Sequence, residues 1–227
     1  MELTGFLAVA LALGVGAAVI FALRREQAAR AVRRARYLSA AGVLFTDRRE
    51  AVQPSGFPRL AGMHEGVEFD VQIVPDTLSL RKLPALWVLV SVPGPLPTGA
   101  MVDVMLRPTG MESFSNFSQL PVQVPVPPGF PADCAVRADA PGAVPFEAAI
   151  RDVLAGVDVD RLKEVLVTPK GVRLVFLAEE AHRGRYLIYR DAEMGRAPLS
   201  PARMAPFLAA AKGLRDAVLR EAEGRMA

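Results

Sequence analysis

Residues 5–23 read GFLAVALALGVGAAVIFAL, nineteen residues without a charged side chain. At 1.5 Å per residue, a helix over this run would be about 28 Å long, which matches the hydrocarbon thickness of a bilayer. A cleaved signal peptide is the alternative, but it requires positive charge before the apolar run and a small-x-small cleavage site after it. Here Glu2 precedes the run, and two arginines follow it directly. The sequence therefore predicts a retained transmembrane helix over residues 5–23, preceded by a short tail, residues 1–4.

The charge beside this helix predicts its direction. Six arginines follow the run and none precede it: Arg24, Arg25, Arg30, Arg33, Arg34 and Arg36. Because arginine-rich flanks stay on the cytoplasmic side, we expect a single-pass protein of a bacterial-type inner membrane, with its N-terminus outside and its large domain in the cytoplasm. These membrane-surface arginines either pair with anionic lipid headgroups or only fix the orientation.

Small residues recur at every fourth position of the apolar run. One row contains Ala8, Ala12 and Gly16, and the other contains Ala10, Gly14, Ala18 and Ala22. Such rows let helices approach closely inside a membrane. They predict helix–helix packing, either with a second copy or with another membrane protein, although an alanine-rich composition would also produce them by chance.

The net charge of +3 is concentrated beside the membrane. Residues 24–36 carry +5, and residues 37–227 sum to −1. A nucleic-acid-binding domain usually has a basic face of its own, so we expect no nucleic-acid partner. Residues 24–40 lack proline and glycine and are rich in helix formers. They predict a basic juxtamembrane helix over residues 24–42, followed by a domain over residues 43–227.

Period-two alternation predicts a mainly antiparallel sheet in this domain. Residues 59–64 and 67–74 flank Glu65-Gly66 and predict a hairpin. Residues 86–92 predict a buried strand. Residues 101–107 alternate, and we expect them to pair with that strand across a proline-rich turn.

The second half of the domain is expected to combine further strands with two helices. Strands are predicted over residues 164–168, 172–178 and 185–189, with a tight turn at Gly171, and helices over residues 145–154 and from Ser200 onward. The apolar residues of the last helix share one face: Met204, Phe207, Leu208, Ala211, Leu214 and Val218. The predicted class is α+β: one N-terminal transmembrane helix followed by a mainly antiparallel sheet domain with a C-terminal packing helix.

Residues 108–145 are rich in proline but also contain Phe114, Phe117 and Phe130. Aromatic residues argue against disorder, so we expect an ordered, extended excursion packed over the sheet, with a short strand at residues 134–137. Long loops inside compact domains are often functional. The three phenylalanines therefore mark a candidate partner-binding loop, unless the excursion only covers an apolar face of the sheet.

We find no catalytic, metal-binding or cofactor-binding motif. His64 lacks the second histidine of the zinc-protease motif, and Glu179 with His182 forms one Glu-x-x-His pair where a di-iron bundle needs two. We expect both histidines to be solvated in turns. Cys134 is the only cysteine, which fits a reducing compartment, and we expect it to be a small core residue.

One cationic group could bind a phosphate, a carboxylate or lipid headgroups. It comprises Arg173, Arg183 and Arg185, if they share one face of the sheet. Alternatively, these arginines are solubilising charges paired with nearby acids, namely Glu179, Glu180, Asp191 and Glu193.

The sequence thus favours a non-enzymatic, membrane-anchored interaction module without a cofactor: an accessory, assembly or scaffold subunit of an inner-membrane protein complex. The membrane and a protein partner, or a second copy bound through the transmembrane helix, are the expected partners. The alternative is a membrane-tethered domain that binds anionic lipid headgroups or a small phosphorylated ligand.

Overall fold

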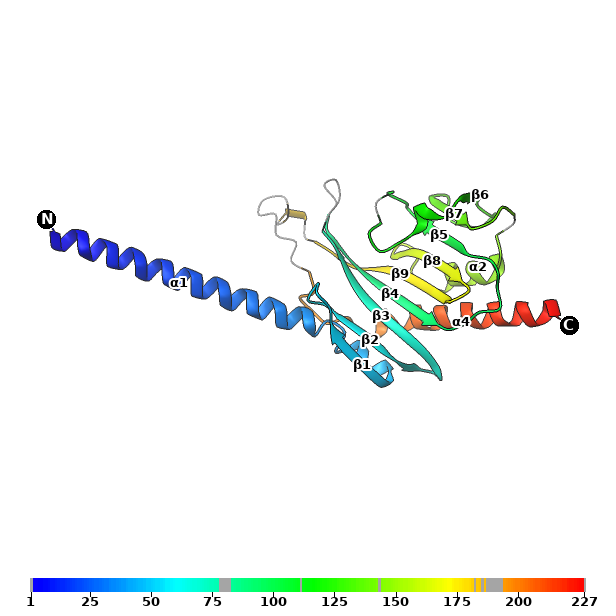
Figure 1. Cartoon of the computed structure of the whole chain (residues 1–227), viewed down its shortest axis with the longest axis horizontal. Coiled ribbons are helices and arrows are strands. Elements are labelled where there is room, and N and C mark those ends of the chain that lie inside the picture. The colour runs from blue at the N-terminus through cyan, green and yellow to red at the C-terminus, as the bar shows by residue number, and fades with distance from the viewer. Residues whose placement is uncertain are drawn as a thin grey trace.

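The computed structural model describes residues 2–77, 83–110, 112–142, 144–181, 183–184, 186 and 194–226, and has a long N-terminal helix and an α+β domain (Figure 1). Helix α1 (Glu2–Ala35) is continuous and projects away from the domain. It ends at Ala35 rather than near Gly42. A turn and the short 3₁₀ helix η1 (Ala41–Leu44) follow, because Tyr37 and Leu38 turn into the hydrophobic core.

In the described part of the chain, nine strands form one antiparallel sheet in the order β1-β2-β3-β4-β9-β8-β5-β7-β6. The strands are β1 (Thr46–Val52), β2 (Pro58–His64), β3 (Val67–Asp76), β4 (Ala85–Pro93), β5 (Val102–Leu106), β6 (Val122–Val124), β7 (Cys134–Ala138), β8 (Leu162–Thr168) and β9 (Gly171–Glu180). The predicted mainly antiparallel sheet, the β2–β3 hairpin and the short strand near residue 134 are confirmed.

The predicted pairing of residues 101–107 with the preceding strand is wrong. Strand β4 pairs with β3 and β9, and β5 instead lies between β8 and β7. The proline-rich connection after β4 therefore crosses over two strands rather than closing a hairpin. Strand β1 was not predicted, because all its side chains are exposed and give no alternation. The strand predicted at residues 185–189 lies outside the described residues, apart from Tyr186.

The glycine predicted at the β8–β9 turn is required by both conformation and space. Gly171 has a φ of 135°, which disfavours other residues. A Cβ atom there would lie 2.2 Å from the carbonyl oxygen of Val92. The β8–β9 hairpin can therefore pack directly on β4 only with glycine at this position.

The inner face of the sheet is apolar and is covered by helices α2 (Glu147–Gly156) and α4 (Pro201–Met226) (Figure 1). The ring of Phe207 stacks on that of Phe176 from β9, with centroids 3.9 Å apart. The six residues predicted to share one face of the last helix are all buried. The C-terminal packing helix is therefore confirmed, and each large side chain that it buries contributes about 1.5–3 kcal/mol.

Helix α2 begins two residues later than predicted. Its N-cap is Phe146, in the left-handed conformation with φ of 60°, so Pro145 precedes the helix instead of occupying its first turn. Buried Ile150 and Val153 turn the helix toward the core.

Candidate functional site

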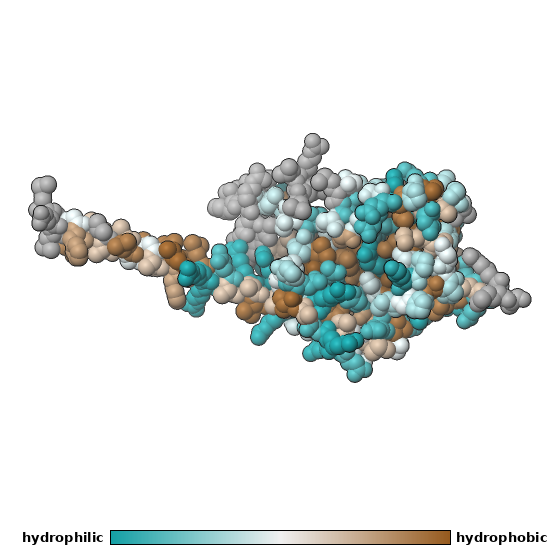
Figure 2. Space-filling model, in the orientation of Figure 1, coloured by the Kyte–Doolittle hydropathy of each residue, from teal (hydrophilic) through white to brown (hydrophobic). Residues whose placement is uncertain are grey.

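Residues 5–8 and 10–23 of α1 are exposed and mostly apolar (Figure 2). Phe6, Leu11 and Phe21 are each at least 70% exposed. Among the described residues, the helix over residues 5–35 is the one long and apolar enough to cross a membrane, with a mean hydropathy of 2.7 in its most apolar window. An exposed apolar surface of this size marks an interaction with a membrane or another protein.

The small residues of α1 lie on this exposed helix. Ala8, Ala10, Ala12, Ala18 and Ala22 are exposed, and a Cβ atom added at Gly14 or Gly16 would meet no atom within 4 Å. Both rows are thus accessible to another helix. The helix–helix contact itself stays a prediction.

Three of the six juxtamembrane arginines contact other side chains of the described residues. Arg30 and Arg33 donate hydrogen bonds to Glu26, at 3.0 and 3.2 Å, and these bonds lower the pKa of its carboxyl group. Arg34 lies 5.7 Å from the centre of the Phe57 ring.

The other arginines, Arg24, Arg25 and Arg36, are exposed. Arg24 and Arg25 directly follow the apolar segment, at the level where headgroups would lie if that segment spans a bilayer. These two are the arginines best placed to meet lipid.

The junction between α1 and the domain belongs to the hydrophobic core. Tyr37 and Leu38 are fully buried, and the backbone N–H of Leu199 donates to the Tyr37 carbonyl at 2.8 Å. The Tyr37 ring meets Phe57 edge-on, with centroids 5.8 Å apart. Burial, reinforced by the nearby Glu179 carboxylate, raises the pKa of the Tyr37 hydroxyl. The chain is therefore packed into the domain from Tyr37, two residues after the end of α1.

The outer face of the sheet carries an extended segment, residues 112–121, which we call the strap. Phe114 of the strap contacts Trp87 of β4, with ring centroids 5.3 Å apart, and Arg137 of β7 lies over the ring of Phe117 at 5.7 Å. Phe130 lies elsewhere, buried in the core. The predicted ordered excursion is confirmed, but its three phenylalanines do not form one exposed surface. Their role in partner binding stays a prediction.

Polar contacts also hold the strap. Glu112 and Lys163 of β8 form an ion pair at 3.1 Å, and both side chains are over 90% buried. The Lys163 ammonium also donates to the backbone carbonyl of Leu106 at 3.0 Å. Although burial opposes ionisation, hydrogen bonds from Thr109 and Lys163 lower the pKa of Glu112. The strap therefore does not simply cover an apolar face, as the sequence had allowed.

Two further acids lie buried beneath the strap. Glu164 of β8 is fully buried and Asp103 of β5 is 2% exposed. Arg173 of β9 contacts Glu164 Oε2 through Nη2 at 3.0 Å and through Nε at 3.1 Å. Burial raises the pKa of both carboxyl groups; for Asp103 the charge of Glu164 adds to this, and for Glu164 the Arg173 guanidinium opposes it.

Sequence reasoning did not single out these buried polar residues. Their signal was present, because Asp103 interrupts the apolar run VDVML, and Lys163-Glu164 interrupts LKEVLV. Charged residues are almost never fully buried unless they are paired. An acid within an otherwise apolar strand is therefore worth weighing as a site, even on the outer face of a sheet.

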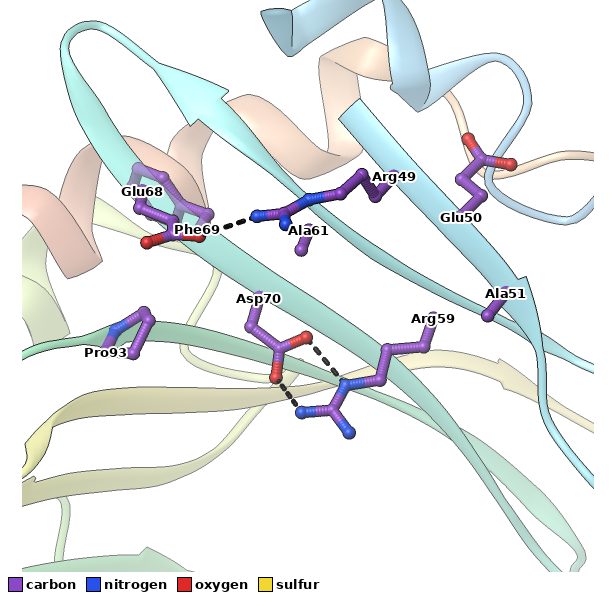
Figure 3. A pocket seen from close by; sticks show the side chains of 9 residues that line it. All are labelled: Arg49, Glu50, Ala51, Arg59, Ala61, Glu68, Phe69, Asp70 and Pro93. Atoms are coloured by element: carbon purple, nitrogen blue, oxygen red, sulfur yellow. Dashed lines mark hydrogen bonds and ion pairs between the residues drawn. The ribbon is translucent and has the colours of Figure 1, made fainter. Parts of the chain in front are cut away.

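A groove of about 420 Å³ crosses the outer face of β1, β2 and β3 (Figure 3). Arg59 binds Asp70 with two hydrogen bonds, of 2.8 and 2.7 Å, and Arg49 contacts Glu68 at 3.4 Å. The small side chains of Ala61, beside Arg49, and of Ala51, beside Arg59, also line the groove. Because both guanidinium groups are paired with acids, the groove is a polar surface rather than an anion site.

The predicted cationic group is only partly described. Arg173 forms the ion pair with Glu164, a partner that the sequence did not suggest. Arg183 is exposed, and Arg185 lies outside the described residues. Anion binding by the three arginines stays a prediction, and the engagement of Arg173 weakens it.

His64 is partly buried at the end of β2, rather than fully solvated in a turn as expected. Its Nδ1 lies 2.8 Å from the Leu44 carbonyl oxygen, and its ring packs on Phe45 and Phe69 with centroids 5.9 and 5.8 Å apart. His182 lies outside the described residues. In the part of the chain that the structure describes, no group of three His, Cys, Asp or Glu side chains could hold a metal ion.

Cys134 is buried, as predicted for a small core residue. Burial, and to a smaller extent Asp133, raises the pKa of its thiol. A thiol of this kind is a weak nucleophile at neutral pH.

Comparisons with known proteins give one distant likeness. No family model matches the chain, and no curated protein matches it. Among solved structures, the chain is similar to the mycobacterial trehalose monomycolate transport factor A, with a TM-score of 0.36 and 13% sequence identity, over 84% of this chain and 96% of that chain. A likeness at this level carries no argument about function.

Proposed function

We propose that this protein is a non-enzymatic interaction module anchored in a bacterial-type inner membrane by α1, with its domain in the cytoplasm. Its role would be that of an accessory, assembly or scaffold subunit of a membrane protein complex. The observation that carries this proposal is the junction, where Tyr37 and Leu38 build the end of the anchor into the core of the domain.

A packed junction favours presentation at a defined height over simple tethering. From Leu23 to Ala35 the helix rises about 18 Å at 1.5 Å per residue, so the domain would stand clear of the headgroups. A flexible linker would suffice to concentrate a protein at a membrane. A rigid one sets the distance and orientation of the domain, which is useful when the partner is itself fixed in the bilayer.

Affinity purification of the full-length protein in mild detergent, followed by mass spectrometry, tests this proposal. The native chain is compared with one variant whose residues 5–23 are replaced by polyleucine, and with another that has a six-residue Gly-Ser insertion after Ala35. We expect stoichiometric membrane partners with the native chain and a several-fold loss with the insertion. Loss with polyleucine as well would place part of the contact in the span. If the native chain captures no partner, the scaffold role is wrong.

Thiol labelling of intact cells tests the orientation. Because Cys134 is buried, the native chain gives a low background. We expect a membrane-impermeant reagent to label Glu2→Cys from outside and to label Glu65→Cys, in the exposed β2–β3 turn, only after lysis. The reverse pattern would place the domain outside the cytoplasm.

Anionic lipid binding is the second candidate function, and the exposure of Arg24 and Arg25 supports it. Each such arginine near an anionic surface is worth about 1 kcal/mol. If binding is specific, anionic lipid co-purifies with the full-length chain and falls several-fold in a variant with Arg24→Gln and Arg25→Gln. Equal lipid content in both proteins would mean that these arginines only fix the orientation of the helix in the membrane.

A further inference from the structure

Asp103 of β5 lies diagonally across from Glu164 in the pairing of β5 with β8, and both side chains are buried on the outer face of the sheet. Asp103 Oδ1 and Glu164 Oε1 have no donor among the described residues, and a hydrogen bond between the two carboxyl groups would satisfy both oxygens. Two ionised carboxylates are both acceptors and cannot form such a bond. A hydrogen bond between them therefore requires a proton on one of the two groups.

The surroundings provide one positive charge for these two acids. Arg173 contacts Glu164 through two nitrogens. Ser115 of the strap lowers the pKa of both carboxyl groups, but by less than burial raises it. If Glu164 is ionised and paired with Arg173, no positive charge is left to balance an ionised Asp103. Asp103 is then expected to keep its proton.

The other charged groups of this face are engaged with the strap. Arg137, which lies opposite Asp103 in the β5–β7 pairing, turns its guanidinium to the carbonyl oxygens of Leu120 and Ser118, at 2.7 and 3.4 Å. The ammonium of Lys163 pairs with Glu112. Two fully charged carboxylates at this depth would repel each other strongly, because the surroundings are poorly polarisable.

We propose that Asp103 and Glu164 form a binding site for a single proton, held between Asp103 Oδ1 and Glu164 Oε1 at neutral pH, and that this proton keeps the strap closed on the sheet. When the proton leaves, two negative charges face one guanidinium beneath Ser115. Lifting the strap admits water and relieves the repulsion. The proton site belongs to the domain itself and is independent of what the domain binds.

Infrared or carbon NMR spectroscopy of the full-length protein in detergent detects the proton directly. At pH 7 we expect the signal of a protonated carboxyl group in the native chain and its loss in Asp103→Asn. The matched control is Asp70→Asn, which removes a carboxylate paired with Arg59 outside the strap and should keep the signal. If Asp103→Asn does not fold, Glu164→Gln replaces it. A native chain with no protonated carboxyl at pH 7, or a signal that survives both substitutions, would overturn the proposal.

The chain also carries its own reporter of strap opening. Trp87 is the only tryptophan and contacts Phe114 of the strap. As pH rises, we expect a red shift of its emission in the native chain and in Asp70→Asn, but not in Asp103→Asn. Native and Asp103→Asn proteins that titrate alike, or a native chain without a shift up to pH 10, would refute the coupling between the proton and the strap.

Discussion

The two faces of the sheet are closed in different ways. Helices α2 and α4 cover the inner face with aliphatic and aromatic side chains such as Phe207 and Leu208. The strap covers part of the outer face with an ion pair, hydrogen bonds to backbone carbonyls, the Trp87–Phe114 contact and the stacking of Arg137 over Phe117. Strand β5 is completely buried between the two closures, but the closures depend on different interactions.

The two closures differ in how they respond to pH and to the loss of one partner. Apolar packing gains about 25 cal/mol per Å² of buried apolar surface, whatever the pH. A buried polar closure gains little net free energy, but it is sensitive to the loss of any one partner and to protonation. The inner face therefore provides stability, whereas the outer face is the one that can respond to conditions.

The largest effect is expected on the inner face, for Phe207→Ala. This change removes the ring stacked on Phe176 and leaves a cavity beneath α4. We expect the free energy of unfolding to fall by about 3–5 kcal/mol, measured by denaturant titration of the full-length protein in detergent. The control, Ala209→Gln on the exposed side of the same helix, should change it by less than about 0.5 kcal/mol. A loss below about 1 kcal/mol for Phe207→Ala would mean that α4 packs loosely.

The contrast between the faces also explains which parts of the structure the sequence predicted. The last helix and the β2–β3 hairpin follow from local periodicity and turn residues, and both are confirmed. The position of β5 between β7 and β8 does not follow from local patterns, because strand order depends on contacts between residues distant in sequence.

The site was harder to predict for the same reason. Whether Asp103 is a solvated edge residue or a buried acid depends on whether the strap lies over it. The strap has no periodicity of its own, and Glu112 meets Lys163 only through the fold.

The second prediction breaks the ion pair that holds the strap. Lys163→Met leaves Glu112 buried without its cation, and we expect a loss of about 3 kcal/mol in unfolding free energy. Adding Glu112→Leu should restore at least half of that loss, because an apolar pair then replaces an unpaired charge. A double variant as unstable as the single one would show that Lys163 acts mainly through its hydrogen bonds to backbone carbonyls.

The third prediction concerns the pH dependence of stability. The pKa of Asp103 is raised by burial and by Glu164, so the folded protein keeps a proton that the unfolded chain releases. From the ordinary aspartate pKa of 3.8 upward, the free energy of unfolding should therefore fall as pH rises, by about 1.4 kcal/mol for each unit by which the pKa is raised. The lowered pKa of Glu112 acts in the opposite direction, but only near and below its ordinary value of 4.5.

Asp103→Asn removes the carboxyl proton from this balance. We expect the variant to be more stable than the native protein by about 1–2 kcal/mol at pH 7, with a flatter dependence between pH 4 and pH 7. Denaturant titrations at a series of pH values measure both quantities. Parallel pH profiles for the two proteins would show that Asp103 does not hold the proton.

The smallest effect is expected for Arg59→Ala, on the part of the outer face that the strap does not reach. Arg59 binds Asp70 with two hydrogen bonds, but its side chain is 52% exposed. Water screens such a pair, so we expect a loss below about 1 kcal/mol, and a similar loss for Asp70→Ala. Denaturant titration at 0.05 and 0.5 M salt should bring both variants closer to the native protein at high salt. A loss above 2 kcal/mol would mean that the groove is as tightly built as the strap site. The proposed division between a stable inner face and a responsive strap would then have to include β2 and β3.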